Sequence, residues 1–186
     1  MSDILTEPLL RPWSIEDIES VLTAFASDDM ATQTQAPIVL AAQAEMWLAP
    51  RMLESPRAVS FAIDLAGVAV GEVALSRINP DHGTAWISYW VTPVARGAGL
   101  ATRAVATLAD WGFDRLELER IELAHRVNNP ASAVVAARAG FLVEGTQRAK
   151  LRYAGERFDV VTNARLFSDP APAFAPLEVI ALELIG

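Results

Sequence analysis

A short glycine-containing run near the middle of the chain has the residue types that bind phosphate. Arg96-Gly97-Ala98-Gly99 follows a β-like segment that ends at Val91-Thr92-Pro93, and a helical pattern begins at about Leu100. Glycines let the backbone approach an anion closely, and the unpaired N–H groups of a helix N-terminus, with the helix dipole, favour a pyrophosphate. Taken alone, such a run is more often a plain glycine turn that leads into a helix.

A second polar cluster opens a later helix. In Asn129-Pro130-Ala131-Ser132, asparagine suits the N-cap and proline suits the first helical position. A structural role for these residues therefore follows from helix-start chemistry alone. The helix is expected to run through Ala139 and to stop at Gly140.

Together the two clusters resemble the motifs of one known family. Arg96, Gly99 and Ala101 fill the fixed places of the pattern Arg/Gln-x-x-Gly-x-Gly/Ala, and the Asn129 run with Ala139-Gly140-Phe141 and Glu144-Gly145 matches the second half. The chain resembles the GNAT superfamily of N-acetyltransferases over roughly residues 8 to 168. It is most similar to the branch of Rim-type ribosomal-protein N-terminal acetyltransferases.

The resemblance implies a coenzyme A site without a metal. The pyrophosphate is expected on Arg96, Gly97, Ala98, Gly99, Leu100 and Ala101, with the hydroxyl of Thr102 as a further donor. In the family, the strand before the loop leaves its parallel neighbour, and its free backbone groups pair with the pantetheine arm. Tyr89, Trp90 and Val91 occupy that place, and Asn129 is expected to touch the same arm.

The catalytic residues are less sharply indicated. Similar enzymes use a serine or tyrosine near the sulfur to protonate the leaving thiolate, which makes Ser132 the candidate acid. The family's aspartate followed four residues later by Tyr or His is represented here by Asp159 and Asn163, and an amide cannot donate a proton in this way. Ser132, Tyr153 or solvent is then left as the proton source.

Two further side chains are candidates for proton transfer. Glu72 lies among Val70, Val73 and Leu75 on an expected strand, so it is either a partly desolvated general base or an outward, solvated carboxylate. His125 alternates with apolar residues and is more often structural than catalytic in such a position.

The implied reaction is direct transfer of an acetyl group from acetyl-CoA to a primary amine in a ternary complex. A covalent enzyme intermediate on sulfur is excluded because the chain has no cysteine. The alternative is a non-catalytic acyl-CoA-binding or regulatory domain that lost its acid. A dinucleotide-binding fingerprint is disfavoured because Thr102 stands where its third glycine belongs. A protein N-terminus, a polyamine, an amino acid and an amino-bearing antibiotic all remain as acceptors.

Composition sets the broad class of the protein. The 186 residues are 52% hydrophobic and carry a net charge of −8, which argues against disorder and against nucleic acid as a partner. Without cysteine there is no disulfide framework and no thiolate metal site, and no segment has the apolar length of a membrane span. The N-terminus lacks signal-peptide features, so we expect a cytoplasmic protein that does not bind membranes.

Period and turn signals predict the order of the elements. Strands are expected at 9–10, 59–63, 68–75, 84–91, 121–127, 141–144 and 158–166, and helices from Ser14, at 41–53, from Leu100 and from Asn129. Ser14 and Asp17 have the spacing of a capping box. The fold class is therefore α/β (α+β), with a mixed sheet and helices on both faces; the resemblance adds mostly antiparallel pairing and splayed central parallel strands.

The end of the chain differs in composition. We expect an acetyltransferase domain at 1–169, followed at 170–186 by a Pro/Ala linker and an apolar segment. Residues 177–185 carry too much apolar surface to remain in water, so they should pack on this domain or on a second copy. A homodimer is the corresponding expectation for the whole protein.

Overall fold

The computed structural model describes residues 7–27, 30, 36–53, 55–153 and 155–180. Its centre is a single eight-stranded sheet with the order β6-β7-β5-β4-β3-β2-β1-β8. Among the strands that the structure describes, only the β4–β5 and β1–β8 pairs are parallel. The strands are β1 (Leu9–Arg11), β2 (Ala58–Leu65), β3 (Val68–Asn79), β4 (Thr84–Val91), β5 (Arg120–Arg126), β6 (Leu142–Tyr153), β7 (Glu156–Leu166) and β8 (Glu178–Val179).

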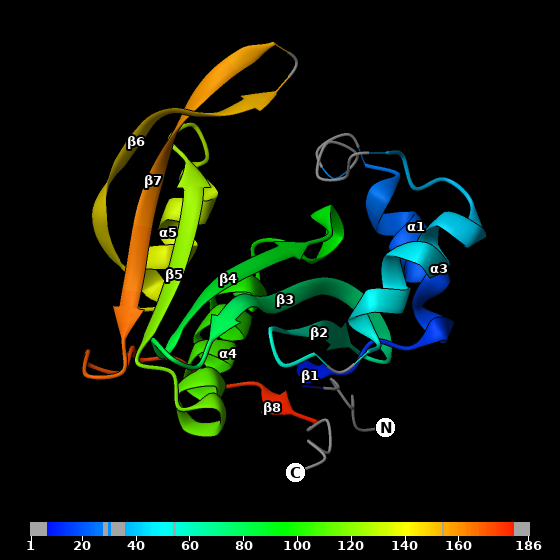
Figure 1. Ribbon diagram of the computed structural model, residues 1–186. Helices are drawn as coiled ribbons and strands as arrows, with labels where there is room; N and C mark the ends of the chain where they lie inside the picture. Colours follow the sequence, from blue (N-terminus) through cyan, green and yellow to red (C-terminus); the bar gives the residue numbers. More distant parts are fainter. Residues whose placement is uncertain (1–6, 28–29, 31–35, 54, 154, 181–186) are drawn as a thin grey trace.

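Helices cover both faces of the sheet (Figure 1), as expected for the fold class. On one face, α1 (Ile18–Phe25) and α3 (Ala41–Leu48) enclose a cluster that includes Trp13, Ala62 and Ala69. On the other face, α4 (Leu100–Leu116) and α5 (Pro130–Arg138) close the larger core. Three 3₁₀ turns, Ile15–Asp17, Ala49–Arg51 and Pro93–Ala95, complete the described helical segments.

The two central parallel strands pair over only three positions. The register runs from Thr84↔Arg120 to Trp86↔Glu122, although β4 continues to Val91 and β5 to Arg126. Beyond Trp86 the two strands diverge, so the expectation of splayed central strands is confirmed. The divergence leaves one edge of β4 without a strand partner at its carboxyl end.

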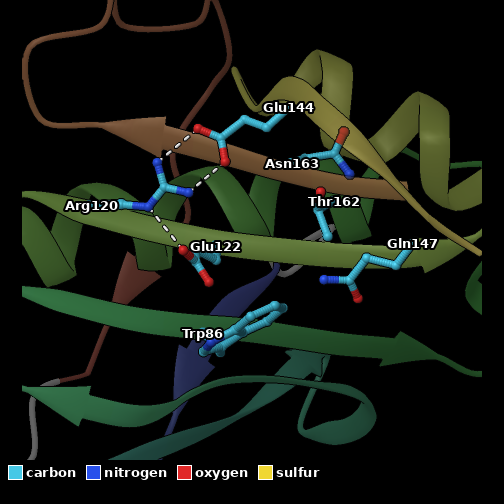
Figure 2. A pocket seen from close by; sticks show the side chains of 7 residues that line it. All are labelled: Trp86, Arg120, Glu122, Glu144, Gln147, Thr162 and Asn163. Atoms are coloured by element: carbon cyan, nitrogen blue, oxygen red, sulfur yellow. Dashed lines mark hydrogen bonds and ion pairs between the residues drawn. The ribbon is translucent and has the colours of Figure 1, made fainter. Parts of the chain in front are cut away.

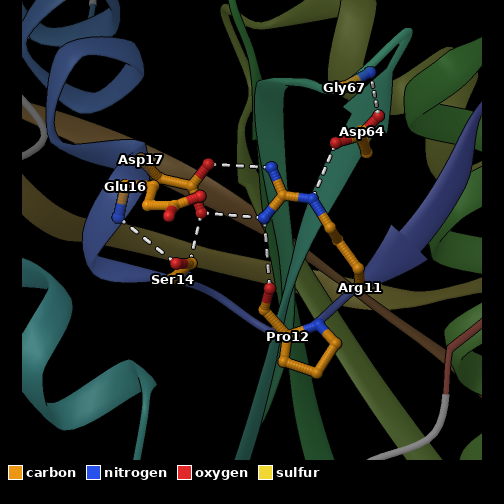
Figure 3. A network of polar contacts seen from close by, with 7 residues as sticks. All are labelled: Arg11, Pro12, Ser14, Glu16, Asp17, Asp64 and Gly67. Atoms are coloured by element: carbon orange, nitrogen blue, oxygen red, sulfur yellow. Dashed lines mark hydrogen bonds and ion pairs between the residues drawn. The ribbon is translucent and has the colours of Figure 1, made fainter.

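Near the N-terminus, a buried ion-pair network fixes the first helical segment on the sheet (Figure 3). Arg11 on β1 donates to Asp17 at 2.8 Å and to Asp64 on β2 at 2.7 Å. These carboxylates raise the pKa of the Arg11 guanidinium, so it stays charged. The Ser14–Asp17 capping box is present as expected, although it opens a 3₁₀ turn before α1 rather than an α-helix.

The second helix is shorter than its sequence pattern suggested. The α-helix ends at Leu48, and residues Ala49–Arg51 form a 3₁₀ turn with Pro50 near its start. Met46 and Leu53, which the expected apolar face included, are 78% and 70% exposed. The expectation of a single helix over 41–53 was therefore wrong at its carboxyl end, because Pro50 lacks the N–H that an α-helical bond would need.

The last two long strands form a hairpin that extends beyond the rest of the sheet (Figure 1). A strand was expected only over 141–144, but β6 continues to Tyr153 through a bulge between Gln147 and Leu151. The hairpin is largely solvent-exposed, so the apolar alternation that marks a buried strand is absent from its outer half.

The described part of the C-terminal segment returns to the same sheet. β8 pairs in parallel with β1, and Ile180 N donates to Leu10 O at 2.8 Å. Leu177 is 4% exposed, and its N–H donates to the Thr107 hydroxyl of α4 at 3.0 Å. Residues 177–180 thus pack on this domain, whereas 181–185 lie outside the described residues.

Candidate functional site

The glycine run forms the turn into α4. Gly97 and Gly99 have positive φ angles of +84° and +76°, a region that favours glycine, and nothing lies within 4 Å of where their β-carbons would be. The first amide to bond into the helix is that of Arg103, which donates to Gly99 O at 3.0 Å. Among the residues that the structure describes, the N–H groups of 97–102 donate to no other group. The turn therefore presents a run of free donors at the positive end of a 17-residue helix.

The side chain of Arg96 ties this turn to the end of β4. Its Nε donates to Val91 O at 3.0 Å. The residue itself is exposed, as are Gly97, Ala98 and Gly99, whereas Leu100 is buried and anchors the first helical turn. Thr102 is half-buried in that turn. The Arg96–Val91 bond and the buried Leu100 thus anchor the loop, whereas residues 96–99 are exposed to solvent.

Backbone groups of β4 face the gap between the central strands. Thr92 N donates to Val70 O of β3 at 2.8 Å. Since N–H groups alternate in direction along a strand, those of Tyr89 and Val91 point away from β3, toward the side that β5 has left. Trp90 is placed differently: its backbone faces β3, and its indole N–H donates to Glu72 Oε2 at 2.9 Å.

Two buried hydroxyls on the same stretch have no hydrogen-bond partner among the described residues, those of Tyr89 and Thr92. Burial raises the pKa of Tyr89, and the side chain of Ser132 acts in the opposite direction without making a bond of good geometry. Orphaned buried hydroxyls carry a desolvation cost that a bound polar group would remove. Tyr89 keeps its proton at neutral pH and can donate it.

The start of α5 brings Ser132 to this place. Asn129 is the N-cap, and its Oδ1 accepts from Ser132 N at 3.1 Å. The structural role expected for both residues is therefore present. Ser132 is half-buried, and its side chain lies near enough to Tyr89 to act on the pKa of the phenol. The start of α5 and β4 therefore approach each other across the gap. Sequence reasoning placed only the backbone of Tyr89 at the site, because alternation gives the face of a side chain but not its neighbours.

Glu72 is buried beneath α3 and is bonded by three donors. Arg51 Nε and Ser60 Oγ donate to Oε1, and Trp90 Nε1 donates to Oε2. Arg51 also lies 3.5 Å from the centre of the Trp47 ring. Of the two alternatives for Glu72, the desolvated carboxylate is the one observed. Arg51 was missed from sequence, although its spacing of four residues from Trp47 places the two on one helix face.

The remaining candidates have structural partners. His125 is 8% exposed, and its Nδ1 lies 3.1 Å from Arg126 O. Asn163 is 2% exposed and donates from Nδ2 to Leu123 O at 3.3 Å. Tyr153 contacts the ring of Phe158 in the outer part of the β6–β7 hairpin.

A polar hollow of about 190 Å³ opens over the β4–β5–β7–β6 part of the sheet (Figure 2). Arg120 bonds Glu122 at 2.9 Å and Glu144 through two donors, and the two carboxylates hold the guanidinium charged. Arg120 in turn lowers the pKa of Glu144. The walls of the hollow also include Trp86, Gln147, Thr162 and Asn163. No group of three or more His, Cys, Asp or Glu that could hold a metal occurs in the described parts of the chain.

The arrangement suits a ligand that is anionic at one end and amide-bearing along its length. Free amides at the α4 turn can bind a pyrophosphate, and the unpaired edge of β4 can bond an extended chain as another strand would. These features, on a mixed sheet with splayed parallel strands, are typical of the fold of acyl-CoA-dependent acyltransferases.

Comparison with known proteins agrees with this class. Residues 9–142 match the family model for the acetyltransferase (GNAT) domain, so the chain belongs to the GNAT family. The ribosomal-protein-serine acetyltransferase of Escherichia coli (strain K12) is 37% identical over 76 residues, which are 41% of this chain and 42% of that protein. The spermidine N(1)-acetyltransferase of the same strain is 34% identical over 85 residues, 46% of each chain. The alignments thus span less than half the length of these two relatives.

Solved structures extend the likeness to nearly the whole chain. Mycobacterium smegmatis RimJ in complex with a CoA-disulfide superposes with a TM-score of 0.77 at 27% identity, covering 85% of this chain and 81% of that one. The expected resemblance to the Rim-type branch is confirmed by these matches. None of the described helices has the length and apolarity needed to cross a bilayer.

Proposed function

We propose that this protein is an N-acetyltransferase that moves an acetyl group from acetyl-CoA to a primary amine by direct attack in a ternary complex. One observation supports it most: the free amides of residues 97–102 adjoin the unpaired edge of β4 at Tyr89 and Val91. A single extended ligand can therefore contact both. Membership of the GNAT family and the CoA-disulfide bound to RimJ favour coenzyme A as that ligand.

Different residues of the site would bind different parts of coenzyme A. The amides from Gly97 to Thr102 would hold the pyrophosphate, and backbone groups of Tyr89 and Val91, with Asn129 nearby, would pair with the pantetheine arm. When bound, acetyl-CoA would supply the activated acyl group, and an N–H near Val91 would polarise its carbonyl. Positioning the amine against this carbonyl would provide most of the rate enhancement.

Proton transfer would complete the reaction. Ser132 is the proposed acid for the departing thiolate, and the buried Tyr89 hydroxyl beside it can return the proton. Glu72 is the proposed base, acting through water, and its carboxylate accepts from Arg51, Ser60 and Trp90. The alternative role of Glu72 is to position Trp90 at the gap through the bond from Trp90 Nε1.

A second candidate function is a non-catalytic acyl-CoA-binding domain. It is favoured by one observation: Asn163, in the place of the family's acid, is buried and bonded to the backbone. Thiol release distinguishes the two functions, because only an enzyme frees CoA faster when an amine is added.

Other expectations remain part of the proposal. We assign 1–169 to the acetyltransferase domain and 170–186 to a linker and apolar segment, in a cytoplasmic protein. The proposal includes a homodimer through the sheet edge, since β6 is the outermost strand and exposes Leu142 and Val143. The relatives' names suggest a protein N-terminus or a polyamine as the acceptor.

The experiment is a pair of matched glycine variants. Gly99→Glu places a carboxylate among the free amides and should abolish acetyl-CoA binding in calorimetry. Gly67→Glu is the control, because Gly67 also has a positive φ with open space around it but lies in the β2–β3 turn. Unchanged affinity in a folded Gly99→Glu variant would place the cofactor elsewhere.

A further inference from the structure

The outer half of the β6–β7 hairpin carries a basic charge that the rest of the chain does not share. We call residues 147–158 the outer hairpin. Four cations lie in it, Arg148, Lys150, Arg152 and Arg157, against the single described carboxylate of Glu156. The outer hairpin carries a net charge of +3 and the whole chain one of −8, so the chain without this segment carries −11. The outer hairpin is thus a local exception in an acidic protein.

These cations form no salt bridge with a described carboxylate, as is also true of the exposed Arg57, Arg115 and Arg138. Arg11, Arg51, Arg103, Arg120 and Arg165 each form a salt bridge with a carboxylate. Within the described residues, Arg148, Lys150 and Arg152 form none, and Arg157 donates only to the backbone oxygen of Ala149. All four side chains are exposed.

The strand register sets two of these charges against each other. Arg152 and Arg157 are direct partners across the hairpin. Like charges opposite each other on an antiparallel pair destabilise it. A bound anion would reduce this repulsion.

Aromatic side chains accompany the charge. The rings of Tyr153 and Phe158 contact each other at a centroid distance of 6.1 Å. Arg126, at the end of β5, lies 4.9 Å from the Tyr153 ring and 5.4 Å from the Phe158 ring. These contacts hold the outer hairpin against the carboxyl end of β5.

The outer hairpin lies beside the approach to the proposed transfer site. Figure 1 shows it extending beyond the carboxyl end of β5, in the direction in which β4 and β5 diverge. In the polar hollow, the described carboxylates Glu122 and Glu144 are matched by Arg120. Glu72, farther along the sheet, is matched by Arg51. The outer hairpin therefore brings four cations beside this approach, against the exposed carboxylates of Glu156 and of Asp159, which accepts from Ala149 N.

We propose that the outer hairpin binds an acidic stretch of a polypeptide acceptor whose free amine enters the gap between β4 and β5. This rests on the proposed function and names its substrate class. A polyamine would bring further cations to a surface already positive, which costs free energy. Nucleic acid fits less well because it has no primary aliphatic amine to present at the site, and the rest of the chain repels it.

The experiment compares two variants of equal net charge. R148Q/K150Q/R152Q removes three cations of the outer hairpin, and R57Q/R115Q/R138Q removes three exposed arginines elsewhere. The probes are a short peptide with several aspartates after a free N-terminus and the same peptide with asparagines in their place. The hairpin triple should raise KM for the acidic peptide about 10-fold with kcat nearly unchanged, and leave the asparagine peptide unaffected. The control triple should change neither.

A binding measurement separates this inference from the proposed function. The acidic peptide with a blocked N-terminus cannot be acetylated, so its fluorescence anisotropy reports the hairpin contact even if the protein transfers no acetyl group. The inference predicts that the hairpin triple binds this peptide more weakly than the control triple does. It also predicts that the wild type binds the peptide more weakly at raised salt than at low salt. Equal binding by both triples overturns it, as does tighter binding of single-stranded RNA or a higher kcat/KM for spermidine than for the acidic peptide.

Discussion

At the scale of single residues, the proposed proton transfer relies on the hydroxyls of Ser132 and Tyr89, which lie near each other at the gap. Ser132→Ala should lower kcat by about 10- to 1,000-fold while leaving the affinity for acetyl-CoA nearly unchanged, because a leaving-group acid acts mainly in the transition state. Ser168→Ala, at an exposed position after β7, is the matched control. Turnover near the wild-type value in Ser132→Ala would limit Ser132 to helix capping and leave Tyr89 or solvent as the proton source.

The raised pKa of Tyr89 gives a second residue-scale prediction. Because burial favours the neutral phenol, its contribution to stability is complete below the unfolded pKa of about 10 and is lost as pH rises through the higher folded value. The free energy of unfolding of the wild type should therefore fall above about pH 10 more steeply than that of Tyr89→Phe. Urea titrations at several pH values measure this. Parallel curves for the two proteins would mean that Tyr89 titrates as if it were solvated.

At the scale of elements, the Arg51–Glu72 pair fastens the end of α3 to β3. Arg51→Gln leaves a buried carboxylate with two neutral donors, and we expect a loss of about 1–3 kcal/mol, moderated because Arg51 is partly exposed. Glu72→Gln should lower the free energy of unfolding by less, since an amide still bonds Ser60 and Trp90 and the Arg51 guanidinium keeps its contact with the Trp47 ring. Denaturant unfolding gives both values, with Arg57→Gln as the exposed control.

The same variants decide the role of Glu72. A general base would make Glu72→Gln lose about 100-fold or more in kcat without a matching loss of stability. If Glu72 instead positions Trp90, Arg51→Gln and Glu72→Gln should both lower the activity to a similar extent, because both displace Trp90. Full activity in both variants would exclude either role.

The elements also indicate what sequence patterns can predict. Thr84–Val91 was expected with its exact bounds because β-branched and aromatic residues lie between a turn signal and a proline. The strand expected at 141–144 covered only the first part of β6. The outer half of β6 is exposed and bulged, so no apolar alternation marks it in the sequence. At the site, the motif located the loop, but the contact of Tyr89 with Ser132 and the bonds of Glu72 arise from packing between distant segments. Such contacts have no local signature.

At the scale of the whole molecule, the C-terminal segment completes the fold that holds the site. Leu177 enters the core beside α4, and β8 covers the outer edge of β1. The segment also receives a bond from Arg103 in the first turn of α4, to Ala175 O at 2.8 Å. The sequence predicted burial of this segment, but both strand and helix suited its apolar spacing. Pairing with β1 selects the strand for Glu178 and Val179.

The last prediction tests this closure. Leu177→Ala removes a buried side chain and should lower stability by about 2–4 kcal/mol, which corresponds to roughly 5–15 °C in Tm for a chain of this size. Ile180→Ala is the control because its side chain is 44% exposed, so its Tm should change far less. Deleting 170–186 should lower Tm at least as much as Leu177→Ala, since it also exposes the edge of β1 and frees Arg103. Light scattering on the same deletion measures whether the segment joins two copies. A truncation with the Tm and mass of the intact chain would show that the segment contributes to neither folding nor assembly.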